Sequence, residues 1–257
     1  TTIMENLRRI ATRYPRFFKE NITAVCVYDW HTDLEAVNDF FLTGTEPVPP
    51  AIFVSEVSPH NSDYYQSFTA ADRRRNHERM QRLRAYYKRQ VITDRQPSSY
   101  AQSLVGFPIA ACLLRNRMAN QRPAFLPYSG ACIPGMKICV QTDGRIDICE
   151  RVNGTYPIGH FQSGGVDFVR VREILAMYRE AVCAHCEKCP ITKLCSVCYS
   201  MTEGNDCFIK DREVCIRMIA KMRESLADFY SIKEANPQAD FSFQTDVAHL
   251  EHRLLFL

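Results

Sequence analysis

Residues 183–198 read CAHCEKCPITKLCSVC. Five cysteines in this short stretch leave little room for a regular helix or strand, so we expect a loop. Two residues separate Cys186 from Cys189, and two separate Cys195 from Cys198. Thiols at this spacing can reach one metal centre from a tight turn. The stretch therefore predicts a metal-binding loop.

Further cysteines flank this loop. Eleven residues separate Cys132 from Gly144, four separate Gly144 from Cys149, and Cys215 follows sixteen residues after the loop. Ten of the twelve cysteines fall between 132 and 215, and the other two come earlier, Cys26 and Cys112. A secreted disulfide scaffold is usually shorter and rich in loops throughout, and the first residues, TTIME, have no export-signal layout. The clustering therefore favours metal binding, and a disulfide-bonded domain stays a third alternative.

Spacing alone leaves two kinds of metal site open. Thiolate is a soft ligand, so an all-sulfur site selects zinc, copper(I) or iron–sulfur clusters. One zinc ion in a non-catalytic binding module needs four thiols, and one such set is Cys186, Cys189, Cys195 and Cys198. Seven to ten thiols close in space are too many for one zinc ion, whereas two four-iron–four-sulfur clusters need about eight ligands.

The first part of the chain has an α/β pattern. Four elements are expected in turn: a helix over 3–14, a strand over 22–28, a helix over 33–41 and a strand over 51–57. The first strand, ITAVCVY, is a near-continuous apolar run that suits burial on both faces of a parallel sheet. Thr32 and Glu35 form a capping box that starts the second helix. This alternation is typical of a parallel α/β unit, and two strands are too few to close a barrel.

Later elements have clear local signals. A charged helix is expected over 69–91, with an inner stripe of Met80, Leu83 and Tyr87. Residues 136–149 predict a hairpin, because Asp143-Gly144 supplies the positive φ angles of a two-residue turn. Two amphipathic helices follow at 168–180 and 211–231. Their inner faces are predicted to hold Phe168, Val171, Leu175 and Tyr178, and then Ile216, Ile219, Met222, Leu226 and Phe229.

The cysteine pattern resembles the SPASM domain, the C-terminal auxiliary-cluster module of radical SAM enzymes that modify peptides and proteins. The resemblance covers about 84 residues and rests on seven cysteines and one glycine at the spacings given above. The chain departs from the family at the last pair of the loop, where three intervening residues are usual and two separate Cys195 from Cys198.

Flanking sequences extend the resemblance. Cys132-Ile-Pro-Gly, Cys149-Glu-Arg and Ile158-Gly159 are similar to maturases that build thioether crosslinks in ribosomally made peptides. The region from Glu5-Asn6-Leu7 to Phe40-Phe41 resembles the last part of their partial (β/α) barrel. The implied fold is therefore an α/β remnant of a partial (β/α) barrel, followed by a small α+β SPASM domain with a β-hairpin and cysteine-ligated clusters. Its parts would be the barrel remnant at 1–95, a helical bridge at 96–130, the SPASM domain at 131–235 and a C-terminal tail at 236–257.

The resemblance also implies two auxiliary four-iron–four-sulfur (4Fe–4S) clusters with interleaved ligands. The first would be held by Cys132, Cys149 and Cys198, and the second by Cys186, Cys189, Cys195 and Cys215. Cys139 is a candidate for the position that the first set leaves open. The remaining cysteines are interpreted as spare or core thiols: Cys26, Cys112, Cys183 and Cys207.

The implied function is that of a cytoplasmic radical SAM peptide maturase. The intact enzyme would use S-adenosylmethionine and a third cluster to form a radical on a cysteine-containing precursor peptide. The cysteine motif with spacings of three and then two residues, which holds such a cluster, does not occur in this sequence. The radical-generating N-terminal part is therefore expected outside this chain, which opens at Thr1 within an expected helix. Sulfatase-type maturation and carbon–carbon crosslinking stay open, because fold analogy does not determine the reaction.

The composition adds two exclusions. Lysine and arginine number 32 and aspartate and glutamate 29, so the net charge of +3 indicates neither a nucleic-acid partner nor an anionic membrane surface. The sequence has no apolar run of the roughly 18 residues that a membrane span needs.

Overall fold

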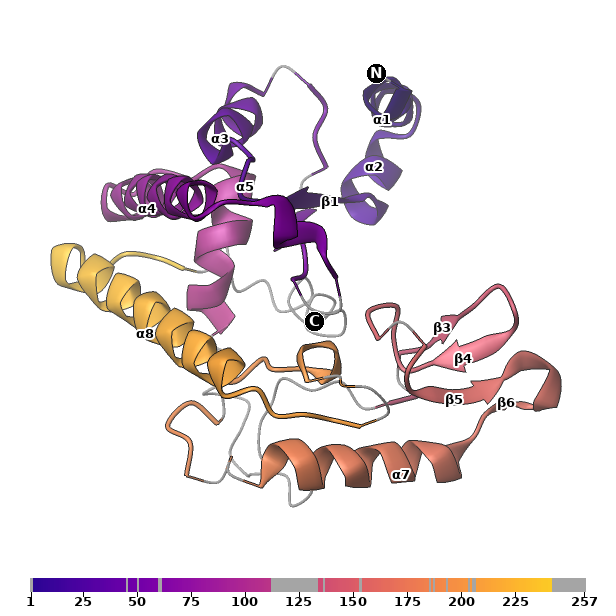
Figure 1. The fold of residues 1–257 in the computed structure, drawn as a ribbon. Coiled ribbons are helices and arrows are strands. Elements are labelled where there is room, and N and C mark those ends of the chain that lie inside the picture. The colour runs from indigo at the N-terminus through magenta and orange to yellow at the C-terminus, as the bar shows by residue number, and fades with distance from the viewer. Residues whose placement is uncertain are drawn as a thin grey trace. The chain divides into compact units, whose positions relative to one another are not determined.

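The computed structural model describes residues 2–44, 46–49, 51–59, 62–111, 134–135, 137–152, 154–184, 186, 188–192, 194–202, 204 and 207–241 (Figure 1). The chain divides into two compact units. We name residues 1–110 with 225–244 the α/β unit, and residues 111–224 with 245–257 the cysteine-rich unit. The module boundaries inferred from the family resemblance stay predictions.

The α/β unit contains the expected order of helices and strands. Its first elements are α1 Thr2–Arg13, α2 Pro15–Asn21, β1 Thr23–Tyr28, α3 Leu34–Thr43 and β2 Ala51–Glu56. β1 and β2 pair in parallel, with Cys26 opposite Val54, so both predicted strands and their parallel pairing are confirmed. The predicted capping residue is wrong by one position. Asp33, not Thr32, caps α3, because its carboxylate accepts hydrogen bonds from the backbone N–H groups of Glu35 and Ala36.

One face of the two-stranded sheet packs on the core of this unit. Ile52 and Val54 are buried against Leu83 and Tyr87 of the next helix. The prediction that the first strand is buried on both faces is wrong, since Val25 is 66% exposed and Val27 60%. Alternate residues of a strand point to opposite faces, so among the described residues only the face of Cys26 and Tyr28 is covered.

Two long helices complete the α/β unit. α4 Ala70–Ile92 buries Leu83 and Tyr87, with Met80 partly buried beside them, so the predicted stripe is confirmed. The second half of α8 Arg212–Ala235 carries Asp228, whose carboxylate accepts from Arg84 Nε and Nη2 at 2.9 and 2.5 Å. The short helix α5 Ser99–Ala101 and the π-helical turn η2 Gln102–Gly106 lie beside β2, where Ser103 Oγ accepts from Val54 N at 3.1 Å.

The cysteine-rich unit contains a four-stranded antiparallel sheet. Its strands are β3 Cys139–Val140, β4 Arg145–Asp147, β5 Pro157–His160 and β6 Gly165–Val166, paired in that order. α7 Phe168–Tyr178 follows and continues into the π-helical turn η4 Arg179–Cys183. The predicted hairpin and the helix after it are confirmed. Phe168 is 72% exposed, however, so its predicted inward position is wrong.

The turn of the hairpin differs from the expected two-residue type. Gln141 N donates to Arg145 O at 2.8 Å, which leaves three residues in the loop. Of these three, Gly144 alone has a positive φ, 89°, as in a type I turn followed by a bulge. A β-carbon at Gly144 would also lie 2.9 Å from the ring of His160. Both constraints explain a glycine at this position.

An aromatic group forms the centre of the cysteine-rich unit. Phe208 stacks on Tyr156 with ring centroids 4.2 Å apart, and Tyr178 packs on Tyr199 at the same distance. Cys149, Cys186 and Cys195 are partly buried against this core. The buried residues at the start of α8 are Val214, Met218 and Met222, whereas Ile216 is 47% exposed. The predicted inner face of this helix is therefore wrong at Ile216.

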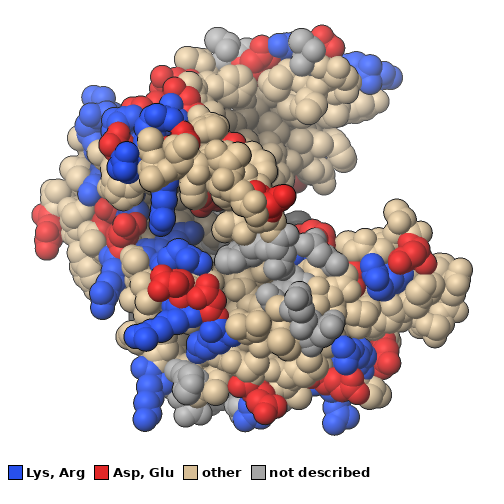
Figure 2. All heavy atoms as spheres, viewed as in Figure 1, with Lys and Arg blue, Asp and Glu red and all other residues tan. Residues whose placement is uncertain are grey.

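The surface shows mixed charge. On the face drawn in Figure 2, acidic and basic side chains lie next to one another instead of gathering in a single-sign patch. On α4, Arg82 pairs with Glu35 and Arg75 with Asp72, which agrees with a solvated helix face. None of the helices in the described part of the chain is long and apolar enough to cross a membrane.

Candidate functional site

The structure describes ten of the twelve cysteines, and all ten are free thiols. Cys112 and Cys132 lie outside the described residues, so the predicted ligand role of Cys132 has no structural account. Three of the predicted ligands, Cys149, Cys186 and Cys195, pack against the core of the cysteine-rich unit. The loop is therefore attached to a folded core that other segments supply.

The cysteine loop is a chain of tight turns. Cys186 N donates to Cys183 O at 2.9 Å, and Cys189 N donates to Cys186 O at 3.1 Å. Thr192, only 3% exposed, donates from Oγ1 toward the carbonyl oxygens of Cys186 and Cys189 at 2.5 and 2.7 Å. Its hydroxyl thus links the two turns that carry these cysteines.

Four thiols of the unit influence one another electrostatically. Burial raises the pKa of the Cys195 thiol to about 11, and the neighbouring charges of Cys186, Cys189 and Cys215 add to the shift. Burial also raises the pKa of Cys215, with Lys210 opposing this and Cys186 and Cys189 reinforcing it. We call Cys186, Cys189, Cys195 and Cys215 the four-cysteine group. These are the residues that the resemblance assigns to the second cluster, an assignment that stays a prediction.

Cys149 and Cys198 form a second, smaller group of thiols. Burial raises the pKa of the Cys149 thiol, a hydrogen bond from Arg151 N opposes this, and the charges of Glu150 and Cys198 reinforce it. Arg151 N lies 3.4 Å from Cys149 Sγ, and the Cys198 sulfur lies 3.2 Å from Ser200 Oγ.

The remaining described cysteines differ in their surroundings. Cys183 is 5% exposed in the core, and Cys207 is exposed. Cys26 packs against the core of the α/β unit, where burial raises the pKa of its thiol. Cys139 lies in β3, and Gln141 Nε2 contacts both its sulfur at 3.9 Å and Asp147 Oδ2 at 2.8 Å. The spare or core interpretation agrees with the burial of Cys183 and Cys26.

The chemistry of the four-cysteine group fits a sulfur-ligated metal. Across the described residues, no set of three or more His, Cys, Asp and Glu side chains is arranged to hold a metal ion. The four thiols are nevertheless unbridged, partly buried and within electrostatic reach of one another. An all-thiol donor set suits zinc or an iron–sulfur cluster, and the cluster needs more room between its ligands than a single ion does.

No family model, curated protein or solved structure matches this chain.

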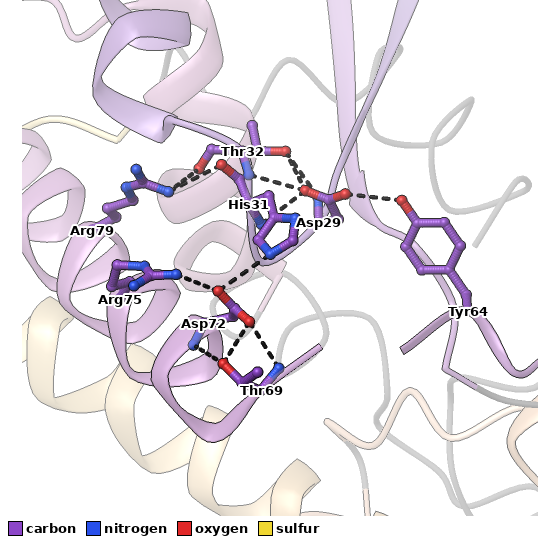
Figure 3. A network of polar contacts seen from close by, with 8 residues as sticks. All are labelled: Asp29, His31, Thr32, Tyr64, Thr69, Asp72, Arg75 and Arg79. Carbon is purple, nitrogen blue, oxygen red and sulfur yellow. Dashed lines mark hydrogen bonds and ion pairs between the residues drawn. The ribbon is translucent and has the colours of Figure 1, made fainter. Parts of the chain in front are cut away.

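A polar network follows the carboxyl end of β1 in the α/β unit (Figure 3). The Asp29 carboxylate accepts from Thr32 N and Thr32 Oγ1, each at 2.9 Å, and from Tyr64 OH at 2.8 Å. Burial alone would raise the pKa of Asp29, but these hydrogen bonds outweigh it and lower the pKa. Arg79 Nη1 donates to the carbonyl oxygens of His31 and Thr32 at 3.1 Å. The loop after β1 is thereby fastened to α4.

The second carboxylate of this network caps α4. Asp72 and Thr69 form a capping box, and His31 Nε2 lies 3.2 Å from Asp72 Oδ1. Hydrogen bonds from Thr69, helped by the charges of His31 and Arg75, lower the pKa of Asp72. The His31 ring also stacks on Phe68 with centroids 4.4 Å apart. Both carboxylates are occupied by turn and cap contacts, so this network is better explained as structural support than as a catalytic site.

Two residues near the cysteines were missed by the sequence analysis. Thr192 and Lys210 contact the four-cysteine group, Thr192 through backbone carbonyls and Lys210 through the Cys186 sulfur at 3.6 Å. A hydroxyl or a lysine in a polar loop carries no periodic signal.

Proposed function

We propose that this chain is the C-terminal part of a radical SAM peptide maturase whose SPASM-type region holds two auxiliary 4Fe–4S clusters. Its substrate would be a ribosomally made, cysteine-containing precursor peptide, and the product a thioether between a cysteine sulfur and a carbon of the peptide. Sulfatase-type maturation and carbon–carbon crosslinking are alternatives within the same enzyme class. The proposal includes a cytoplasmic location, where the thiols stay reduced.

The observation that carries the proposal is the spacing of seven cysteines and Gly144 between residues 132 and 215. Cys215 at the start of α8 influences the thiols of the 186–195 loop, and Cys198 influences Cys149 after the hairpin. A zinc site made of the loop alone would group Cys198 with Cys195 instead. These neighbours agree with the SPASM-type ligand assignment, which rests on the cysteine spacing.

The residues of this chain would hold and position the clusters. The four-cysteine group would supply the ligands of one cluster. Cys149 and Cys198, with Cys132, would supply three ligands of the other and leave one position for Cys139, another residue or the substrate. Thr192 fixes the turns that present Cys186 and Cys189. When bound, such clusters supply an electron acceptor or a binding position for a peptide thiolate.

The radical chemistry would need a part that this chain does not provide. In the family that it resembles, a third cluster and S-adenosylmethionine are held by a cysteine motif whose spacings do not occur in this sequence. That part would complement the present chain, either within a longer polypeptide or as a separate piece.

Metal analysis after anaerobic purification tests the proposal. Two 4Fe–4S clusters would give brown protein with about eight irons and about eight acid-labile sulfides per chain. Colourless protein with one zinc per chain and no labile sulfide would contradict the enzyme proposal and support the zinc-bound module. Substituting Cys198 further distinguishes the zinc site from the clusters. It would remove a ligand of the single zinc site, whereas in the cluster assignment it would affect the cluster that Cys149 also holds and leave the other one in place.

A further inference from the structure

Lys210 lies on the inward side of an extended segment. Phe208 is 5% exposed and stacks on Tyr156, whereas Ile209 is 56% exposed. Ile209 N donates to Thr202 O at 2.7 Å, which holds the segment against its neighbour. Side chains alternate along extended backbone, so Lys210 returns to the side of Phe208 and is itself half-buried. A lysine on that side needs a negative partner, because burying an uncompensated charge is costly.

The partner found in the structure is a cysteine sulfur. Lys210 Nζ donates to Cys186 Sγ at 3.6 Å. Lys210 thus contacts a member of the four-cysteine group that lies 24 residues earlier in the sequence. In the part of the chain that the structure describes, no carboxylate forms an ion pair with Lys210, and the adjacent Asp211 is 4.0 Å from Arg217 instead.

A metal centre with four thiolate ligands carries a net negative charge. A cation that donates a hydrogen bond to one ligand sulfur offsets part of that charge and orients the ligand. In an iron–sulfur cluster it also favours the reduced, more negative state, because hydrogen bonds and charges near the sulfurs set the reduction potential.

We propose that Lys210 is a positioning residue for the metal centre of the four-cysteine group, donating to the Cys186 sulfur and offsetting the charge of the bound centre. This inference rests on the proposed function in one respect, since it requires a metal or cluster at these cysteines. It holds for zinc, cobalt or an iron–sulfur cluster alike, because each leaves an anionic all-thiolate centre.

The test uses the full chain, reduced and anaerobic, with cobalt(II) as the first probe. Lys210→Met keeps the aliphatic stem and removes the charge, and Lys210→Arg keeps a charge. Lys188→Met removes an exposed lysine of the cysteine loop. Thiolate–cobalt absorption gives the dissociation constant of each variant. We expect Lys210→Met to bind cobalt about 10- to 100-fold more weakly, the usual loss when a partner of a metal ligand is removed. Lys210→Arg and Lys188→Met should stay close to wild type.

A second readout uses iron-reconstituted protein. With iron content matched, Lys210→Met should show a lower midpoint potential than wild type in a titration followed by electron paramagnetic resonance, and Lys210→Arg should restore it. If Lys210→Met keeps both the wild-type cobalt affinity and the wild-type potential, the role of Lys210 is refuted while the metal site stands. An equal effect of Lys188→Met would refute it as well, by showing a general charge effect. Wild-type protein that binds neither cobalt nor iron would overturn both this inference and the proposed function.

Discussion

Thr192→Val is expected to weaken metal retention at the four-cysteine group while leaving the fold intact. The change is close to isosteric and removes one hydroxyl, which is 3% exposed and contacts the carbonyl oxygens of Cys186 and Cys189. Both carbonyls keep another donor, because Cys189 N donates to Cys186 O at 3.1 Å and Thr192 N donates to Cys189 O at 3.2 Å. Neither is left unsatisfied, so the loss should be close to that of one ordinary hydrogen bond, about 1 kcal/mol.

That free energy corresponds to roughly a fivefold change in an equilibrium constant. We therefore expect iron to pass from reconstituted Thr192→Val to a chelator about fivefold faster than from wild type, under anaerobic conditions, if opening of the loop limits release. The matched control is Thr202→Val. Thr202 is also 3% exposed and donates to carbonyl oxygens, those of Cys198 and Tyr199, at 3.3 and 3.1 Å.

The two variants should act on different iron pools. Thr192→Val should accelerate release from the cluster of the four-cysteine group, and Thr202→Val from the cluster near Cys149. Release that is unchanged in Thr192→Val, or one phase accelerated equally by both variants, would refute the argument that Thr192 holds the turns of the metal loop.

Three further predictions follow from the same structure. Cys195→Ser should lose about four of about eight irons and make residues 183–215 more sensitive to protease. Cys207→Ser changes an exposed thiol and should retain full iron. Equal iron in the two variants would contradict the ligand assignment. Asp72→Asn should lower the melting temperature at neutral pH, because folding lowers the pKa of Asp72 and the ionised carboxylate therefore stabilises the fold. This stabilisation is present above the unfolded pKa of about 4 and is lost as pH falls below that value. The gap in melting temperature between this variant and wild type should therefore close on acidification, and a gap that widens would contradict the sign. Finally, the reconstituted chain with dithionite and S-adenosylmethionine should form no 5′-deoxyadenosine, and formation above a cluster-free control would show that one of these cysteine sets generates the radical.

Local signals account for most of the elements that were predicted correctly. The near-continuous apolar run predicted β1 and the Asp-Gly pair predicted the hairpin, because these patterns depend on a few neighbouring residues. The predicted turn type was wrong, because Gly144 takes a positive φ and Asp143 does not. The pairing of Gln141 with Arg145 leaves a three-residue loop instead of a two-residue one. Which face of a strand is covered depends on distant segments, so the exposure of Val25 and Val27 was not predictable from their run of apolar neighbours.

The buried face of α8 illustrates a second limit. Apolar residues lie on more than one side of this helix, and the prediction placed Ile216 inside although Val214, Met218 and Met222 are the buried residues there. Further along, the stripe continues through the buried polar residue Asp228, which is paired with Arg84 from α4. A pattern search for apolar residues excludes such a position, because the partner that makes its burial tolerable is 144 residues away.

The candidate site was predictable as a set of residue types, and its supporting contacts were not. The cysteine spacing identified Cys149, Cys186, Cys195 and their neighbouring cysteines as candidate ligands. Lys210 and Thr192 were missed because their roles depend on a half-buried ammonium group and on two carbonyl oxygens, neither of which has a sequence signature.

Anomalous scattering at the iron edge, from crystals of anaerobically prepared protein, tests the central claim most directly. We predict one group of iron atoms bounded by Cys186, Cys189, Cys195 and Cys215, and a second beside Cys149 and Cys198. A single metal held by Cys186, Cys189, Cys195 and Cys198, with scattering at the zinc edge and none at the iron edge, would contradict it.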